Sequence, residues 1–219
     1  MAKDIKQIIQ SEYIKCAKDP VHFMRKYCKI QHPTRGKINF DLYPFQEKAL
    51  TQFKDHDYNI ILKSRQLGIS TLTAGYTLWG MIFNADFNAL VIAIKQDTAK
   101  NLVTKIRVMH ENLPSWLKGQ VLEDNKLSLR LKNGSQVKAV SSSPDAGRSE
   151  ALSLLVIDEA AFIDGIDEIW TSAQQTLATG GRCIALSTPN GVGNWFHKEW
   201  VKAENGENKF STIRLHWTV

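Results

Sequence analysis

The chain has 219 residues, 43% of them hydrophobic, and a formal net charge of +6, which together suit one globular domain that binds an anionic partner. No run of about 18 apolar residues occurs, and the first residues lead into no apolar core segment, which argues against a membrane span and a secretory signal peptide. Cys16, Cys28 and Cys183 are odd in number and lack metal-ligand spacing, so we expect reduced, structural cysteines.

The N-terminal part of the chain is predicted to be helical. Two short helices are expected between residues 4 and 30, the second after Asp19-Pro20, because proline is favoured in the first turn of a helix. Residues 31–42 are polar and contain proline and glycine, so they are predicted to form a loop. We assign residues 1–40 to an N-terminal helical segment that packs on a main domain of residues 41–219.

The main domain alternates between strand and helix patterns. Apolar runs predict strands at residues 59–62, 89–94, 152–157, 183–187 and 210–216. Helices are predicted at residues 43–53, 70–83, 97–112, 167–177 and 194–202. This alternation indicates an α/β fold with a mostly parallel central sheet and helices on both faces.

The segment between Val121 and Val140 follows a different pattern. Leucines occupy alternate positions from Leu127 to Leu131, and Asn133-Gly134 separates this run from a second one. An Asn-Gly pair between two alternating runs is a strong hairpin signal. We therefore predict a small β-hairpin insertion here.

A glycine-containing loop after the first predicted core strand comes close to the phosphate-binding pattern G-x-x-x-x-G-K-[ST]. Gly68 and Ser70 fit, but Ile69 stands at the lysine position and Lys63 at the first glycine position. Backbone N–H groups at a helix N-terminus attract phosphate oxygens whatever the side chains are. The expected nucleotide-binding residues are the loop and its flanks: Lys63, Ser64, Arg65, Gln66, Leu67, Gly68, Ile69, Ser70 and Thr71.

Without a lysine at position 69, the terminal phosphates lack their usual positive charge. Lys63 has a long side chain and could fold back over the phosphates from the start of the loop, and Arg65 could reach them too. Both residues therefore stay open as the group that holds the γ-phosphate.

Two acidic residues, Asp158 and Glu159, directly follow the apolar run at residues 152–157. Ligands of open α/β sheets bind at the carboxyl ends of the strands, so this pair is expected at the binding edge. Asp158 and the hydroxyl of Ser70 are predicted to hold Mg²⁺, which prefers oxygen ligands. Glu159 is predicted to polarise the attacking water as a general base.

Three motifs together resemble the ATPase motor of tailed-phage large terminase subunits, which drive viral DNA into an empty procapsid. They are Ser64–Gly68, Val156–Phe162 and Leu186–Gly191, and the resemblance spans residues 40 to 200, approximately. In that family a lysine displaced to the start of the phosphate loop is a known variant, and Lys63 matches it by position. The resemblance implies a P-loop NTPase of the additional-strand catalytic-glutamate type that uses ATP and Mg²⁺.

Further roles follow from the resemblance by position. Gln46 matches the glutamine that reads adenine, since an amide can both donate to and accept from the base edge. Ser187 and Thr188 match the coupling motif that senses the γ-phosphate. Arg148 is a candidate arginine finger toward a neighbouring subunit, and Arg65 is the competing candidate within its own subunit.

The resemblance implies Mg²⁺-dependent ATP hydrolysis that powers translocation of double-stranded viral DNA. The implied partners are the portal protein of the procapsid and the small terminase subunit. The resemblance also implies that the protein forms a homo-oligomeric ring on the portal and is a monomer in isolation. The implied location is the host cell cytoplasm. Lys100, Lys105 and Arg107 could contact DNA phosphates, but a solvated helix face is the simpler explanation, so no DNA-contacting residue is assigned.

Two other functions are compatible with the motifs. A helicase-like translocase core should carry a second motor lobe, and a non-hydrolytic nucleotide-binding module has no need of a water-activating carboxylate such as Glu159. A two-metal nuclease needs clustered carboxylates. Past Val201 only Glu204 and Glu207 are acidic, so a nuclease domain is expected to be absent and no nuclease activity is predicted.

Overall fold

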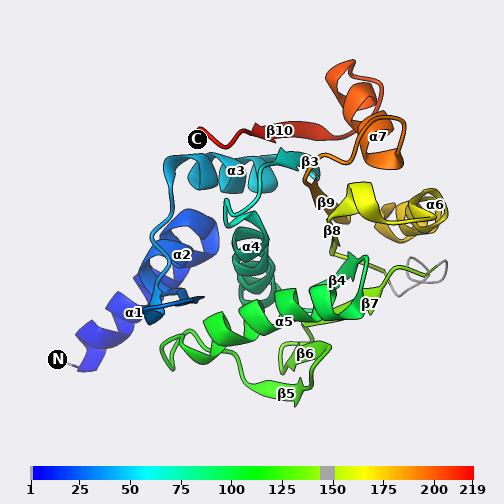
Figure 1. Cartoon of the computed structure of the whole chain (residues 1–219). Helices are drawn as coiled ribbons and strands as arrows, with labels where there is room; N and C mark the ends of the chain where they lie inside the picture. Colours follow the sequence, from blue (N-terminus) through cyan, green and yellow to red (C-terminus); the bar gives the residue numbers. More distant parts are fainter. Residues whose placement is uncertain (1, 144–150) are drawn as a thin grey trace.

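The computed structural model describes residues 2–143 and 151–219, which are arranged around one large sheet and one small one (Figure 1). The large sheet has eight strands in the order β10-β3-β9-β8-β4-β7-β6-β5. Its strands are β10 (Ser211–Leu215), β3 (Tyr58–Lys63), β9 (Arg182–Ser187), β8 (Leu154–Asp158), β4 (Asn88–Ala93), β7 (Gln136–Ser141), β6 (Ser128–Leu131) and β5 (Val121–Asp124). The pairs from β10 to β7 are all parallel, which confirms the predicted mostly parallel sheet.

The strand order identifies the subclass of this sheet. β9 lies between β3, which leads into the glycine loop, and β8, which carries the acidic pair. This inserted strand is the additional strand expected for the predicted class of P-loop fold. It places the ends of β3, β9 and β8 side by side, so that their following residues meet at one edge.

Helices cover both faces of the sheet, as predicted. One apolar cluster joins Ile61, Val91 and Val156 to α3 (Pro44–Asp55), α4 (Ile69–Phe83) and α5 (Gln96–Glu111). Neighbouring strand residues point the other way, because side chains alternate along a strand. Those residues, such as Ile60 and Ile157, pack with η1 (Ala160–Phe162), α6 (Ile166–Leu177) and α7 (Trp195–Glu204).

The N-terminal segment contains α1 (Ala2–Lys18) and α2 (Pro20–Tyr27), as expected, and also a two-stranded sheet. The predicted loop at residues 31–42 was wrong, because β1 (Lys29–His32) and β2 (Gly36–Asn39) form an antiparallel hairpin within and beside it. Ile30 pairs with Ile38 across the hairpin, and Gly36 takes a positive φ of 69° at the turn. Proline and glycine therefore mark the turn of this hairpin rather than a structureless loop.

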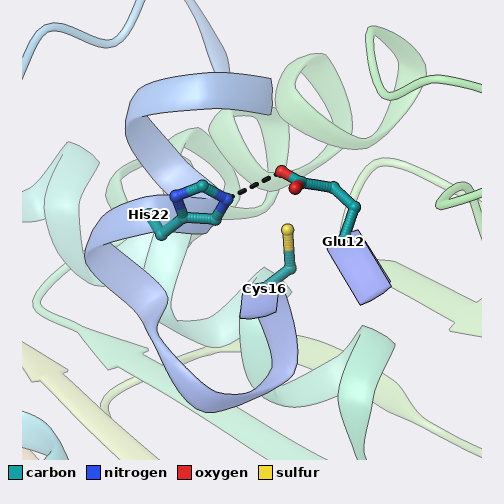
Figure 2. A group of neighbouring side chains, drawn as sticks. All are labelled: Glu12, Cys16 and His22. Carbon is teal, nitrogen blue, oxygen red and sulfur yellow. Dashed lines mark hydrogen bonds and ion pairs between the residues drawn. The ribbon is translucent and has the colours of Figure 1, made fainter. Parts of the chain in front are cut away.

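An ionic cluster joins α1 to α2 (Figure 2). Oε1 of Glu12 accepts hydrogen bonds from His22 Nε2 at 2.7 Å, Lys26 Nζ at 2.7 Å and Tyr27 OH at 2.9 Å. Potential metal-ligand atoms of Glu12, Cys16 and His22 lie within 4.8 Å of one another. Lys26 already supplies the countercharge to this carboxylate, so the cluster is an internal ion pair that fastens the first two helices together.

The predicted hairpin turn at Asn133-Gly134 is confirmed, and its strands are β6 and β7. β7 also pairs in parallel with β4, so the hairpin extends the edge of the central sheet. Cys16, Cys28 and Cys183 are free and buried. Among the described residues, no helix combines the length and apolar character needed to cross a membrane.

Candidate functional site

The loop between β3 and α4 forms one wall of a pocket of about 300 Å³. Gly68 and Gln66 have positive φ angles of 71° and 63°, so the backbone turns sharply before α4 begins at Ile69. The pocket is lined by residues from the loop, the first turn of α4 and α5: Lys63, Ser64, Gln66, Leu67, Gly68, Ile69, Ser70, Thr71 and Lys105. Eight of the nine predicted loop residues therefore meet at one cavity at a helix N-terminus, a position that suits phosphate.

Arg65 is the predicted loop residue that does not line this pocket. Its side chain is exposed, and the structure shows no ion pair between it and any residue of the described ranges. Arg148, the other candidate arginine finger, lies outside the described residues. The choice between these two fingers stays open.

A buried isoleucine, Ile69, occupies the position at which phosphate-binding loops usually carry a lysine. Its side chain is 1% exposed and belongs to the apolar cluster beneath α4. Position 69 thus contributes to packing, and Lys63, at the end of β3, is a cation that lines the pocket.

Lys63 and Glu159 meet across the ends of β3 and β8. Nζ of Lys63 lies 2.8 Å from Oε1 of Glu159, and the lysine side chain is 8% exposed. The other carboxylate oxygen, Oε2, accepts hydrogen bonds from the backbone N–H and the hydroxyl of Thr188, both at 3.1 Å. The hydroxyl of Ser187 lies 3.4 Å from the same oxygen. The predicted base and the predicted coupling residues are therefore in direct contact.

These contacts determine the protonation of Glu159. Burial raises the pKa of this carboxyl, but hydrogen bonds from Lys63 and Thr188 outweigh burial and leave the pKa below its ordinary value. Glu159 also has a left-handed backbone, with φ of 52°, which non-glycine residues adopt at a cost of about 1–3 kcal/mol. The carboxylate is thus held ionised in a strained and specific position.

Asp158 is the buried carboxylate beside the loop. Its Oδ1 accepts a hydrogen bond from the backbone N–H of Glu159 at 3.1 Å and lies 3.5 Å from the hydroxyl of Ser70. Burial raises the pKa of Asp158, against the opposing influence of Lys63. A buried carboxylate facing a loop hydroxyl is an all-oxygen donor set, which fits Mg²⁺.

Gln46 makes two hydrogen bonds within the protein. Its Oε1 accepts from the backbone N–H of Tyr43 at 3.1 Å, and its Nε2 donates to the backbone carbonyl of Leu67 at 2.9 Å. The side chain is 3% exposed and connects the start of α3 to the phosphate loop. In this structure the amide supports the loop, while its reading of adenine stays a prediction.

Lys105 lines the pocket, but the sequence assigned it no role in nucleotide binding. The sequence grouped it with Lys100 and Arg107 as a surface cation of one helix. Arg107 instead pairs with Asp124 at 2.5 Å, and Lys105 faces the phosphate loop. Only its place on the helix after β4, the neighbour of β8, could have indicated this position.

Comparison with known proteins gives one matching family and several similar folds. The family model described as "Terminase large subunit, T4likevirus-type, N-terminal" matches residues 60–217. The ATPase domain of the large terminase from Thermus phage P74-26 has a TM-score of 0.65 and 20% identity, over 80% of this chain and 81% of that one.

Two longer proteins share the fold. The large terminase of bacteriophage HK97 has a TM-score of 0.70 and 17% identity, over 90% of this chain and 43% of that one. The large terminase of a thermophilic bacteriophage, solved in complex with ADP, has a TM-score of 0.65 and 15% identity, over 79% of this chain and 45% of that one. The chain therefore spans less than half the length of these two proteins.

Proposed function

Because this chain belongs to the family of T4likevirus-type terminase large subunits, of which it matches the N-terminal region, we propose that it hydrolyses ATP to drive viral double-stranded DNA into a procapsid. The observation that carries the proposal is the convergence of Lys63, Asp158 and Glu159 on the glycine loop. These groups provide a positive charge, a metal ligand and a base, which are the parts that phosphoryl transfer to water needs.

Each group has a proposed role in the reaction. The loop N–H groups and Lys63 bind the phosphates, and Ser70 and Asp158 hold Mg²⁺. When bound, Mg²⁺ neutralises charge that develops on the phosphate oxygens. Glu159 accepts a proton from the attacking water, and Arg65 or Arg148 acts as the arginine finger.

The contacts of Thr188 with Glu159 support a coupling role for this residue and its neighbour Ser187. Since both touch the carboxylate that would activate water, a shift at the end of β9 changes the position of the base. We propose that this link connects the state of the nucleotide to movement of DNA.

The same proposal includes the partners of the motor. They are the portal protein and the small terminase subunit, with a homo-oligomeric ring on the portal and a site of action in the host cytoplasm.

Phosphate release from Mg²⁺-ATP tests the enzyme activity. We expect Glu159→Gln to lower turnover by at least ~100-fold, because general-base catalysis contributes about 10²–10⁴. Glu168→Gln, an exposed change on α6, is the matched control and should keep the wild-type rate. A wild-type rate no higher than that of Glu159→Gln would refute the proposed hydrolysis.

Lys63→Ala tests the source of the positive charge separately. We expect weaker ATP binding and slower turnover, whereas Lys118→Ala, at an exposed site after α5, should change neither. Turnover and affinity unchanged in Lys63→Ala would leave the hydrolysis intact but would exclude Lys63 as the displaced lysine.

A further inference from the structure

Lys105 lies on α5, which packs beside α4, the helix that follows the phosphate loop (Figure 1). Its side chain is partly buried and lines the same pocket as the loop and Lys63. The structure therefore brings a second lysine, from a different helix, to the cavity proposed to hold the nucleotide phosphates.

The ammonium of Lys105 lacks an ion-pair or hydrogen-bond partner within residues 2–143 and 151–219. Neighbouring cations are paired: Lys63 with Glu159, and Arg107 with Asp124. Burial lowers the pKa of the Lys105 ammonium, Asp158 opposes this shift, and Lys63 adds to it. A partly desolvated cation without a partner is costly, so its position is favourable when an anion enters the pocket.

We propose that Lys105 binds the terminal phosphates of the nucleotide as a second cation alongside Lys63. This inference rests on the proposed function, because it takes the nucleoside triphosphate as the ligand of the pocket. Lys63 and Ser70, which are proposed to bind the γ-phosphate and the metal, line the same pocket as Lys105, so the terminal phosphates are the part of the ligand that Lys105 faces. Lys105 would thus add to the positive charge that Ile69, in place of the usual loop lysine, does not supply.

The test is equilibrium binding of ATPγS and of ADP, each with Mg²⁺ and without DNA. Lys105→Met removes the charge but keeps most of the aliphatic stem, and Lys105→Arg keeps the charge. Lys100→Ala on the same helix is the control, since Lys100 does not line the pocket. We expect Lys105→Met to weaken ATPγS binding by about 10- to 100-fold, the range of a hydrogen bond to a charged group, and ADP binding by less.

Lys105→Arg should recover most of the ATPγS affinity, and Lys100→Ala should stay within about twofold of wild type. ATPγS affinity of Lys105→Met within the range of Lys100→Ala overturns the inference. Equal losses for ATPγS and ADP overturn the assignment to the terminal phosphates.

Failure of this inference can be told apart from failure of the proposed function. A wild-type protein that neither binds ATPγS nor releases phosphate from ATP refutes both. A wild-type protein that binds and hydrolyses ATP, with a Lys105→Met variant that behaves in the same way, refutes only the role of Lys105. Thermal unfolding of each variant identifies any loss that comes from misfolding.

Discussion

The ammonium of Lys63 lies 2.8 Å from Oε1 of Glu159, so the proposed phosphate-binding lysine and the proposed base form an ion pair. Burial raises the pKa of the Glu159 carboxyl, but hydrogen bonds from Lys63 and Thr188 hold it below its ordinary value. Lys63 also lines the pocket proposed to hold the nucleotide, so one ion pair links that pocket to the proposed base.

Thr188 is the other restraint on Glu159, and its removal gives the first prediction. Thr188→Val removes the hydroxyl hydrogen bond to Oε2 but keeps the backbone one. We expect turnover to fall by about tenfold, as for the loss of ~1.4 kcal/mol, because the carboxylate loses one of the contacts that fix its orientation, with ATP affinity nearly unchanged. Rates and KM of Thr188→Val and of Thr171→Val, an exposed control on α6, provide the measurement. An unchanged rate for Thr188→Val argues against a coupling role.

Restoring the usual loop lysine should not rescue the site. Ile69 is 1% exposed and packed in the core, so Ile69→Lys places a charge where an apolar side chain is needed. We expect it to lower the free energy of unfolding by at least ~2 kcal/mol, and Ile69→Leu by less than ~1.5 kcal/mol. Urea unfolding checks both values. Recovery of ATP turnover in the double variant Lys63→Ala, Ile69→Lys would contradict this packing role.

The parts of the site that the sequence predicts are those that depend only on the order of neighbouring segments along the chain. The glycine loop follows a strand and opens a helix, and Asp158-Glu159 follows a buried strand, so both could be placed without a structure. The partners of Glu159 could not, because contact with Thr188 depends on β9 lying beside β8. Lys105 was missed for the same reason, since its orientation depends on how α5 packs.

The errors in the fold prediction have a local cause. β1 and β2 each contain four residues, too few to separate a strand pattern from a polar loop. Their pairing is visible only across the turn, where Ile30 meets Ile38. Longer runs such as β4 and β9 were predicted correctly because their apolar character is continuous.

Gly68 should resist substitution for two reasons that can be separated. Its φ is 71°, and a Cβ at this position would lie 2.8 Å from Nε2 of Gln46, which supports the loop. Gly36 has nearly the same φ, 69°, but open space around it. Gly36→Ala therefore measures the backbone cost alone, about 1 kcal/mol.

We expect Gly68→Ala to destabilise the protein more than Gly36→Ala does, and also to weaken ATP binding, because the displaced Gln46 no longer holds the carbonyl of Leu67. Chemical unfolding and nucleotide titration of the two variants give the comparison. Equal destabilisation with full ATP affinity in both would show that the contact with Gln46 does not matter.

The ionic cluster of Glu12 makes the stability of the N-terminal segment depend on pH. Hydrogen bonds from Lys26 and His22 lower the pKa of Glu12 to about 2 from an ordinary 4.5. Because the folded-state pKa lies below the unfolded one, this stabilisation is complete above pH 4.5 and is lost as the pH falls toward 2. Glu12→Gln, which carries no charge, should therefore unfold more easily than wild type at pH 7, and the difference should shrink as the pH falls from 5 to 3. Urea unfolding at a series of pH values measures this trend. If the difference in free energy of unfolding between wild type and Glu12→Gln stays constant from pH 5 to pH 3, the charge of Glu12 contributes nothing to holding α1 on α2.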